Sequence, residues 1–179
     1  MCGSDPIRYA RRLGVTLGEG CRILENPARV FGSEPYLITV GNHVSIAIGV
    51  RFITHDGGVW IFRAEHPELE VFNRIVVGNN VFIGINALIL PQVTIGDDSV
   101  IGAGSVVTRS VPARTLAAGC PARPISKVED YWAKIQSRAS HIRSLGGQAK
   151  REAVLRHLEA LGPNEAAMDK AEVAARAGF

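Results

Sequence analysis

The chain has 179 residues, 46% of them hydrophobic, which is enough for one domain with a sizeable core. Its 20 lysines and arginines against 17 acidic residues leave a net charge of +3, too little for a protein that displaces counterions along a nucleic acid. The longest nearly apolar run, Val81 to Pro91, is shorter than the roughly 20 residues that span a bilayer, so we expect neither a nucleic-acid partner nor a membrane span.

The N-terminal residues favour a cytoplasmic location, because Met1 to Asp5 is polar and no apolar stretch of a secretory signal follows it. Cys2, Cys21 and Cys120 are an odd number of cysteines at wide spacings. We therefore expect reduced thiols rather than a disulfide framework or a zinc cluster.

A short helix is the first predicted element. Ser4 and Asp5 precede Pro6, which suits the first helical position, and the residues up to Gly14 can continue the helix. We expect residues 1–14 to form a helical cap on the structure that follows.

Residues 15–56 show a spacing of six that is present but irregular. Apolar residues at this spacing are Leu17 and Ile23 and then, after a drift through 27–35, Val40, Ile46 and Phe52. Because this phase does not run into Val77 by multiples of six, residues 57–74 must leave the repeat and return to it as a loop. Loops on rigid repeats often carry binding groups, although aromatic side chains can equally anchor a loop. The residues in question are Trp60, Phe62, Arg63, His66 and Phe72.

From Val77 onward the spacing of six is unbroken. The residues that open the hexapeptides are Val77, Ile83, Ile89, Ile95, Ile101 and Val107, and the fifth members are Val81, Ala87, Val93, Ser99, Ser105 and Val111. A period of six fits neither a helix nor a free-standing strand, but it fits one flat side of a coil. Three sides per turn place Val77 under Ile95, so the sequence predicts a parallel β-helix.

The corners of this coil are expected to need residues that tolerate positive φ. Residues of that type are Gly78, Asn80, Gly84, Asn86, Gly96 and Gly104. The coil is expected to span residues 15–127 and to end in turn-forming residues at 117–124. A helical extension over 128–179 follows, with one helix from Val128 to about Leu145 and a second from Ala149 to Leu161.

The motifs of the regular repeat, with Val77-Gly78-Asn79-Asn80-Val81-Phe82-Ile83-Gly84 as their first run, resemble those of hexapeptide-repeat acyltransferases, and most closely the maltose/galactoside and polysaccharide O-acetyltransferases. The resemblance covers most of residues 13–127. It implies an all-β, left-handed parallel β-helix, a homotrimer, and acetyl-CoA bound in a groove between subunits. It also implies a histidine near the loop that deprotonates the acceptor, and His55 is the histidine that matches.

The same resemblance assigns the coenzyme-binding residues. These are Gly84, Ile85, Ala103, Thr108, Arg109, Gly119, Arg123 and Lys127. The chain departs from the family pattern at three positions. Phe82 replaces a common tryptophan, Ile85 a small or polar residue, and Cys120 an asparagine, which affects the details of coenzyme contact rather than the reaction class.

The chemistry of acyl transfer requires a base, donors to the developing oxyanion and alignment of the reactants, because a thioester is already activated. His55 is the expected base, although a lone histidine at the end of a strand is often structural. A backbone carbonyl could orient its ring. Asp56 points to the opposite face of an extended chain, so it shapes the loop or touches the acceptor. Backbone N–H groups near Gly84 are the expected oxyanion donors. Cys120 has no histidine near it in sequence and is a poor nucleophile candidate.

The sequence therefore predicts an acetyl-CoA-dependent O-acetyltransferase that acts on the hydroxyl of a sugar or polysaccharide precursor, with Asp56, Trp60 and Arg63 as acceptor-binding residues and no metal. N-acetylation of a nucleotide-linked amino sugar is the alternative. A zinc site of the γ-class carbonic anhydrase type is disfavoured, because His43, His55 and His66 are twelve and eleven residues apart. A non-catalytic β-helical scaffold is the remaining alternative for the function of the chain.

Overall fold

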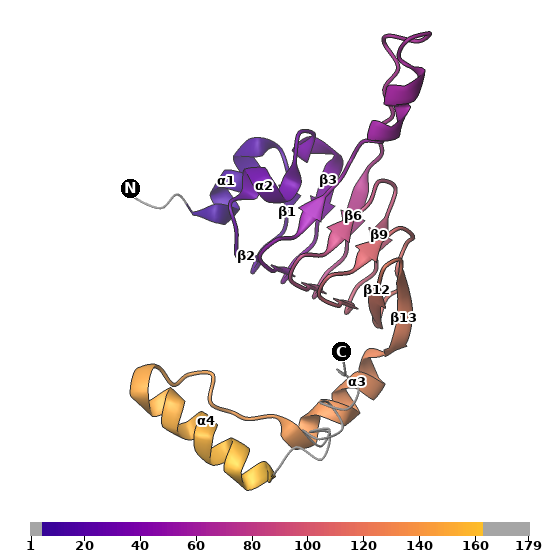
Figure 1. Cartoon of the computed structure of the whole chain (residues 1–179). Helices are drawn as coiled ribbons and strands as arrows, with labels where there is room; N and C mark the ends of the chain where they lie inside the picture. Colours follow the sequence, from indigo (N-terminus) through magenta and orange to yellow (C-terminus); the bar gives the residue numbers. More distant parts are fainter. Residues whose placement is uncertain (1–4, 163–179) are drawn as a thin grey trace, which may run out of the picture. The chain divides into compact units, whose positions relative to one another are not determined.

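The computed structural model describes residues 5–162, and the chain divides after Tyr131 into two units. The predictions for Ser4 and for the tail after Pro163 lie outside the described residues. In the first unit the chain winds through three sheets in turn, and successive turns lie side by side (Figure 1). The predicted boundaries of the cap (1–14), the coil (15–127) and the extension (128–179) remain predictions.

Each sheet of the coil is built from very short parallel strands. The first sheet holds β1 (Thr16–Leu17), β3 (Ile38–Val40), β6 (Ile75–Val77) and β9 (Thr94–Ile95). The second holds β2 (Arg22–Ile23), β4 (Ser45–Ile46), β7 (Phe82–Ile83), β10 (Val100–Ile101) and β12 (Thr115–Gly119), with β13 (Ala122–Lys127) antiparallel at its edge. The third holds β5 (Arg51–Phe52), β8 (Leu88–Ile89) and β11 (Val106–Val107).

The strand register confirms three six-residue sides per turn. Val77 pairs with Ile95, and the other hexapeptide openers pair at the same separation of eighteen residues. All six openers and all six fifth members are buried, so they form one continuous core inside the coil. Each added turn also satisfies the backbone groups of the turn before it, which holds such short strands in place.

The corners confirm part of the sequence prediction and correct the rest. A residue with positive φ recurs at every sixth position: Asn80, Asn86, Gln92, Asp98 and Gly104. Gly78, Gly84 and Gly96 do not have positive φ, so the reason predicted for these glycines is wrong. A Cβ atom on Gly84 would lie 2.6 Å from the backbone nitrogen of Ala103. Glycine is needed there because the next turn of backbone approaches closely.

The N-terminal part of the coil carries two helices, one before the first strand and one within the first turn. α1 (Pro6–Leu13) begins at Asp5, whose carboxylate accepts a hydrogen bond from the Ile7 backbone, and ends at Gly14 with φ of 107°. α2 (Pro27–Phe31) stands where the third sheet would have its first strand, and the ring of Phe31 stacks on Phe52 at 5.3 Å. The 3₁₀ turn η1 (Pro35–Leu37) then leads into β3.

The predicted loop leaves the coil between β5 and β6 (Figure 1). Val40 pairs with Val77, 37 residues later, so this turn is nineteen residues longer than a regular one. The loop contains the 3₁₀ turn η2 (Gly57–Phe62). Its two ends are joined by backbone hydrogen bonds from Asp56 to Val71 and from Asn73 to Thr54. The loop is therefore closed at its base and does not disturb the register.

The first C-terminal helix is shorter than predicted, whereas the second begins within two residues of its predicted start and ends at the predicted residue. α3 (Val128–Ile135) ends ten residues earlier than expected and is followed by the 3₁₀ turn η3 (Gln136–Arg138), and α4 (Gly147–Leu161) comes next. Neither α3 nor α4 buries a residue, so no tertiary packing extends the first helix through its apolar positions. Within residues 5–162 no helix is long and apolar enough to cross a membrane.

Candidate active site

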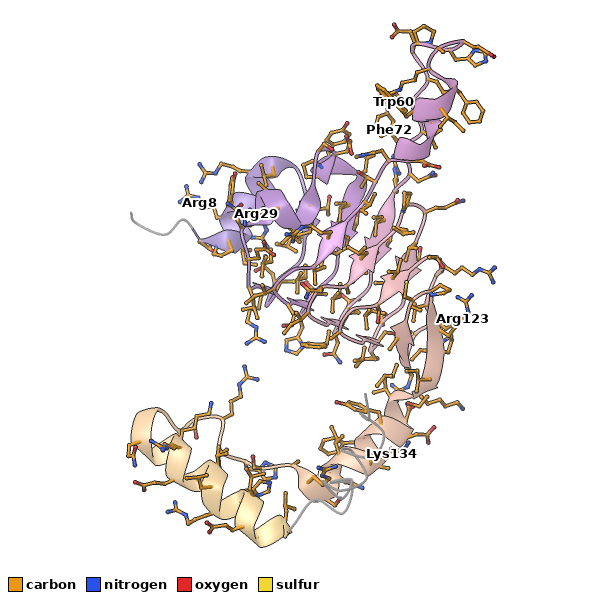
Figure 2. All side chains as sticks on the ribbon, in the orientation of Figure 1. Arg8, Arg29, Trp60, Phe72, Arg123 and Lys134 are labelled. Carbon is orange, nitrogen blue, oxygen red and sulfur yellow. The ribbon has the colours of Figure 1, made fainter. Side chains whose placement is uncertain are left out.

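His55 lies three residues after the end of β5, where the loop leaves the coil. It forms an isolated antiparallel bridge with Phe72, and the two rings meet edge to face at 6.4 Å between centroids. Figure 2 shows Phe72 and Trp60 on this loop. The His55 side chain is 42% exposed, so a reactant in solution can reach it.

Glu34 is the orienting partner of His55. Its Oε2 atom lies 2.9 Å from His55 Nδ1 and 2.6 Å from the hydroxyl oxygen of Thr54. The Glu34 side chain is only 14% exposed, because it lies just before η1 with the buried Pro35 next to it. A side-chain carboxylate therefore fills the role for which the sequence suggested a backbone carbonyl. No spacing could have identified it, because it falls in the stretch where the period of six is lost.

The contacts of Glu34 favour its ionised form. Burial opposes the charge, but hydrogen bonds from Thr54, His55 and Ser33 outweigh burial and hold the pKa of Glu34 below its usual value. An ionised carboxylate only accepts hydrogen bonds, so His55 donates from Nδ1. Its Nε2 atom is then free to accept a proton, which is the arrangement of a general base.

The expected acceptor-binding residues lie on the loop. The Asp56 carboxylate accepts a hydrogen bond from the Gly58 backbone at 2.8 Å and so caps η2. Trp60 is 72% exposed. The guanidinium of Arg63 lies 5.8 Å from the centre of the Trp60 ring and pairs with Glu70. Asp56 therefore shapes the loop, whereas Trp60 presents an open aromatic surface.

Several of the expected coenzyme residues gather at the corner between the second and third sheets. Gly84 faces the backbone of Ala103 in the next turn, and the backbone of Gly104 donates to the carbonyl of Ile85 at 2.7 Å. One turn further, the Gly119 backbone donates to the hydroxyl of Ser105 at 3.2 Å. These residues form one column of small or backbone-exposing positions along the coil.

Arg123 extends this column, because it pairs with Ala118 across the β12–β13 hairpin. Figure 2 shows Arg123 on this hairpin. Lys127 does not belong to the group. It pairs with Thr115 at the opposite end of the hairpin and lines a separate cavity with Arg114 and Glu129.

Thr108 and Arg109 lie on the same side of the coil as His55. They directly follow β11, and His55 follows β5 in the same parallel sheet. All three residues therefore lie on the side of that sheet where the carboxyl ends of its strands meet, which is here called one edge of the sheet. Gly84 and Ile85 lie at the opposite edge, before β8. One chain thus carries two groups of expected site residues, one at each edge of the third sheet.

The remaining histidine and cysteine candidates are separate from this site. His43 Nδ1 lies 2.8 Å from Asn80 Oδ1 at a corner of the coil, and His66 is exposed on the loop. Among residues 5–162 no three histidine, cysteine or acidic side chains are close enough together to hold a metal. Cys21 and Cys120 are free thiols.

Comparison with known proteins places the repeat in a described family. Residues 74–109 match the family described as bacterial transferase hexapeptide (six repeats). Protein CapG of Staphylococcus aureus is 54% identical over 141 residues, which cover 79% of this chain and 82% of CapG. Galactoside O-acetyltransferase of Escherichia coli is 42% identical over 97 residues, which cover 54% of this chain and 47% of that enzyme.

The structural similarity is to the same group of proteins. The hexapeptide-repeat-containing acetyltransferase of Vibrio cholerae has a TM-score of 0.58 and 28% identity, and the match covers 71% of this chain and 83% of that one. A second structure of this acetyltransferase, in complex with acetyl coenzyme A, has a TM-score of 0.54 and 30% identity and covers 67% of this chain and 75% of its own.

Proposed function

The chain belongs to the hexapeptide-repeat acyltransferases, and on this premise we propose that it transfers the acetyl group of acetyl-CoA to a sugar hydroxyl, with His55 as general base. The observation that carries the proposal is the 2.9 Å contact between His55 Nδ1 and the ionised Glu34 beside an exposed imidazole. This contact gives the histidine one fixed tautomer and one free basic nitrogen.

The reaction is a direct transfer. His55 Nε2 accepts the proton of the acceptor hydroxyl while its oxygen attacks the thioester carbonyl, and Glu34 stabilises the imidazolium that forms. The tetrahedral intermediate then collapses, the carbon–sulfur bond breaks, and the coenzyme leaves as a thiolate that takes up the proton from His55. The Gly84 N–H already donates to the Ile101 carbonyl, so the neighbouring Ile85 N–H is proposed as a donor to the oxyanion.

Acetyl-CoA as the donor is supported by the complex of the Vibrio cholerae acetyltransferase, which matches this chain over most of both lengths. Arg109 and Arg123 are exposed and positively charged, which suits the phosphates of the coenzyme. We assign the pantetheine arm to the column of Gly84, Ala103 and Gly119, in which Ala103 and Gly119 are exposed. Lys127 is the least favoured of the eight residues because of its position across the hairpin.

The proposed assembly is a left-handed coil that forms a homotrimer. Gly84 lies before β8 and His55 lies after β5, so the two residues stand at opposite ends of the strands of the third sheet. Neighbouring copies related by threefold symmetry would bring the edge of one coil against the opposite edge of the next. The dependence on acetyl-CoA is consistent with a cytoplasmic reaction.

A sugar acceptor is supported by two observations. The galactoside O-acetyltransferase matches this chain over 97 residues and acts on a galactoside, as its name states. Trp60 presents an exposed indole near His55 along the loop, and an aromatic face of this kind packs well against the carbon–hydrogen face of a sugar ring. Arg63, held over Trp60 and paired with Glu70, is proposed to bind an acceptor oxygen.

The test is acetyl-CoA turnover against a panel of sugars and amino sugars, measured as released thiol. In His55→Ala the turnover number is expected to fall about 10²–10⁴-fold while acetyl-CoA binding, measured by calorimetry, is retained. His66→Ala is the matched control, because His66 is exposed on the same loop and is expected to keep full activity. Undiminished turnover in His55→Ala contradicts the proposal, and turnover only with amino sugars changes the acceptor from a hydroxyl to an amine.

A further inference from the structure

Three polar side chains are fully buried in the described core, and one of them differs from the other two. Ser99 Oγ lies within hydrogen-bond distance of the backbone carbonyls of Asp97 and Pro112 and can donate to either, and Ser105 donates to that of Gly102. These two hydroxyls stabilise corners of the coil. Thr54, which is 2% exposed, donates instead to a carboxylate, that of Glu34.

Thr54 and His55 meet the same oxygen atom. Thr54 Oγ1 lies 2.6 Å from Glu34 Oε2 and His55 Nδ1 lies 2.9 Å from it, although neighbouring residues on an extended chain point in opposite directions. Both side chains nevertheless reach Glu34 Oε2, at the point where the closed base of the loop joins the coil. One carboxylate oxygen therefore holds both residues.

We propose that Thr54 is a positioning residue that fixes Glu34 Oε2 in the place where it orients His55. The inference rests on the proposed function and adds a residue that acts on His55 through Glu34. A hydroxyl can rotate freely and can donate to only one acceptor, and the distance of 2.6 Å is that of a charge-assisted bond to a carboxylate. Thr54 thereby restricts the rotation of the Glu34 carboxylate, and His55 inherits that restriction through its Nδ1 contact.

The charged surroundings of Glu34 are simple. His55 is the titratable group that acts on it among the described residues, and the other donors, Thr54 and Ser33, are uncharged hydroxyls. Loss of the Thr54 donor removes one of the bonds that hold the pKa of Glu34 low. The carboxylate is then protonated at a higher pH, and it is held in place less firmly.

The experiment compares Thr54→Val, which keeps the shape and removes the hydroxyl, with Thr54→Ser, which keeps the hydroxyl. Valine is expected to lower kcat about fivefold, which is the effect of one net hydrogen bond, with the KM for acetyl-CoA unchanged. Serine is expected to restore kcat. Should valine prevent folding, Thr54→Ala provides the same comparison.

Ser99→Ala is the matched control, because it removes a hydroxyl that is equally buried but bonded only to backbone. It is expected to lower thermal stability and to leave kcat unchanged. An unchanged kcat in Thr54→Val overturns the inference, and so does a serine variant as impaired as valine, which indicates packing alone. The His55→Ala result separates these outcomes from failure of the proposed function itself.

Discussion

The regular repeat over residues 75–111 and the irregular turns over residues 15–56 build the same coil in different ways. In the regular part every sixth residue is buried and every turn adds eighteen residues. In the irregular part Leu17 pairs with Val40, 23 residues later, and α2 replaces a strand. The catalytic candidates Glu34 and His55 both come from the irregular part.

The candidate catalytic side chains come together where the chain departs from the regular repeat. A side chain in a perfect hexapeptide is either buried in the core or stacked on its equivalent in the next turn, so two different residues are seldom brought to one point. Glu34 reaches His55 because the chain leaves the repeat twice, once at α2 and η1 and once at the loop. The proposed coenzyme residues Gly84 and Ala103 lie in the regular part, where small residues recur at the corners.

The largest effect is expected from cavities in the two parts. Ile83→Ala in the regular part and Phe31→Ala in the irregular part each remove a completely buried side chain and are expected to lower the free energy of unfolding by about 2–5 kcal/mol. Urea denaturation measures both losses. At urea concentrations at which both variants are still folded, Phe31→Ala is expected to lose more activity than Ile83→Ala, because Phe31 holds the segment that leads to Glu34. Equal residual activity would show that this segment is positioned independently of α2.

The second effect concerns the catalytic candidates alone. Glu34→Gln keeps the size of the side chain but removes the charge that stabilises the imidazolium of His55, so kcat is expected to fall about 10²-fold with little change in stability. Steady-state kinetics and a thermal melt measure the two quantities. Glu25→Gln is the control, because Glu25 is paired with Arg51 in a second carboxylate contact outside the site. A similar loss in both variants would argue against a special role for Glu34.

The third effect separates the two kinds of corner glycine. A methyl group on Gly84 would collide with the backbone of Ala103, whereas Gly104 has φ of +66° and open space around its Cβ position. Gly84→Ala is expected to cost more than Gly104→Ala, which is expected to cost about 1 kcal/mol through backbone strain. Denaturant titration of both variants measures the order. The reverse order would mean that φ, and not the approach of the next turn, limits these positions.

The smallest effect is a pH dependence of stability. The pKa of Glu34 in the folded protein lies below the ordinary value of 4.5, because hydrogen bonds from Thr54, His55 and Ser33 outweigh its burial. Ionised Glu34 therefore contributes stability above pH 4.5 that is lost as the pH falls through its folded pKa. Thermal melts across this range are expected to show wild type converging on Glu34→Gln as the pH falls. A constant difference between them would contradict the lowered pKa.

The sequence was sufficient for the coil but only partly for the site. The separation of Val77 and Ile95, the loop and the position of His55 at its base follow from counting apolar residues, because a strict period leaves one register that buries them. Glu34 could not be found in this way, since a contact between Glu34 and His55 depends on two departures from the period. The extent of α3 was also missed, because its apolar positions have no core to pack against.

The expected coenzyme residues illustrate a second limit. The resemblance named eight positions, and the fold distributes them over different edges of the coil, with Gly84 at one edge of the third sheet, Arg109 at the other, and Lys127 at the far end of the hairpin. A list of positions contains no information on which copies of the chain face one another. That information comes from the shape of the surface, which a single sequence does not encode as a pattern.

The closed base of the loop has a consequence for how such proteins diversify. Because Asp56 bonds to Val71 and Asn73 bonds to Thr54, the entry and exit of the loop are adjacent, and the turns on either side keep their register whatever lies between. The loop can therefore be exchanged or lengthened without change to the coil, because closing a longer loop costs little additional entropy. New acceptors could be acquired in this way while the histidine, its carboxylate and the thioester site are inherited unchanged.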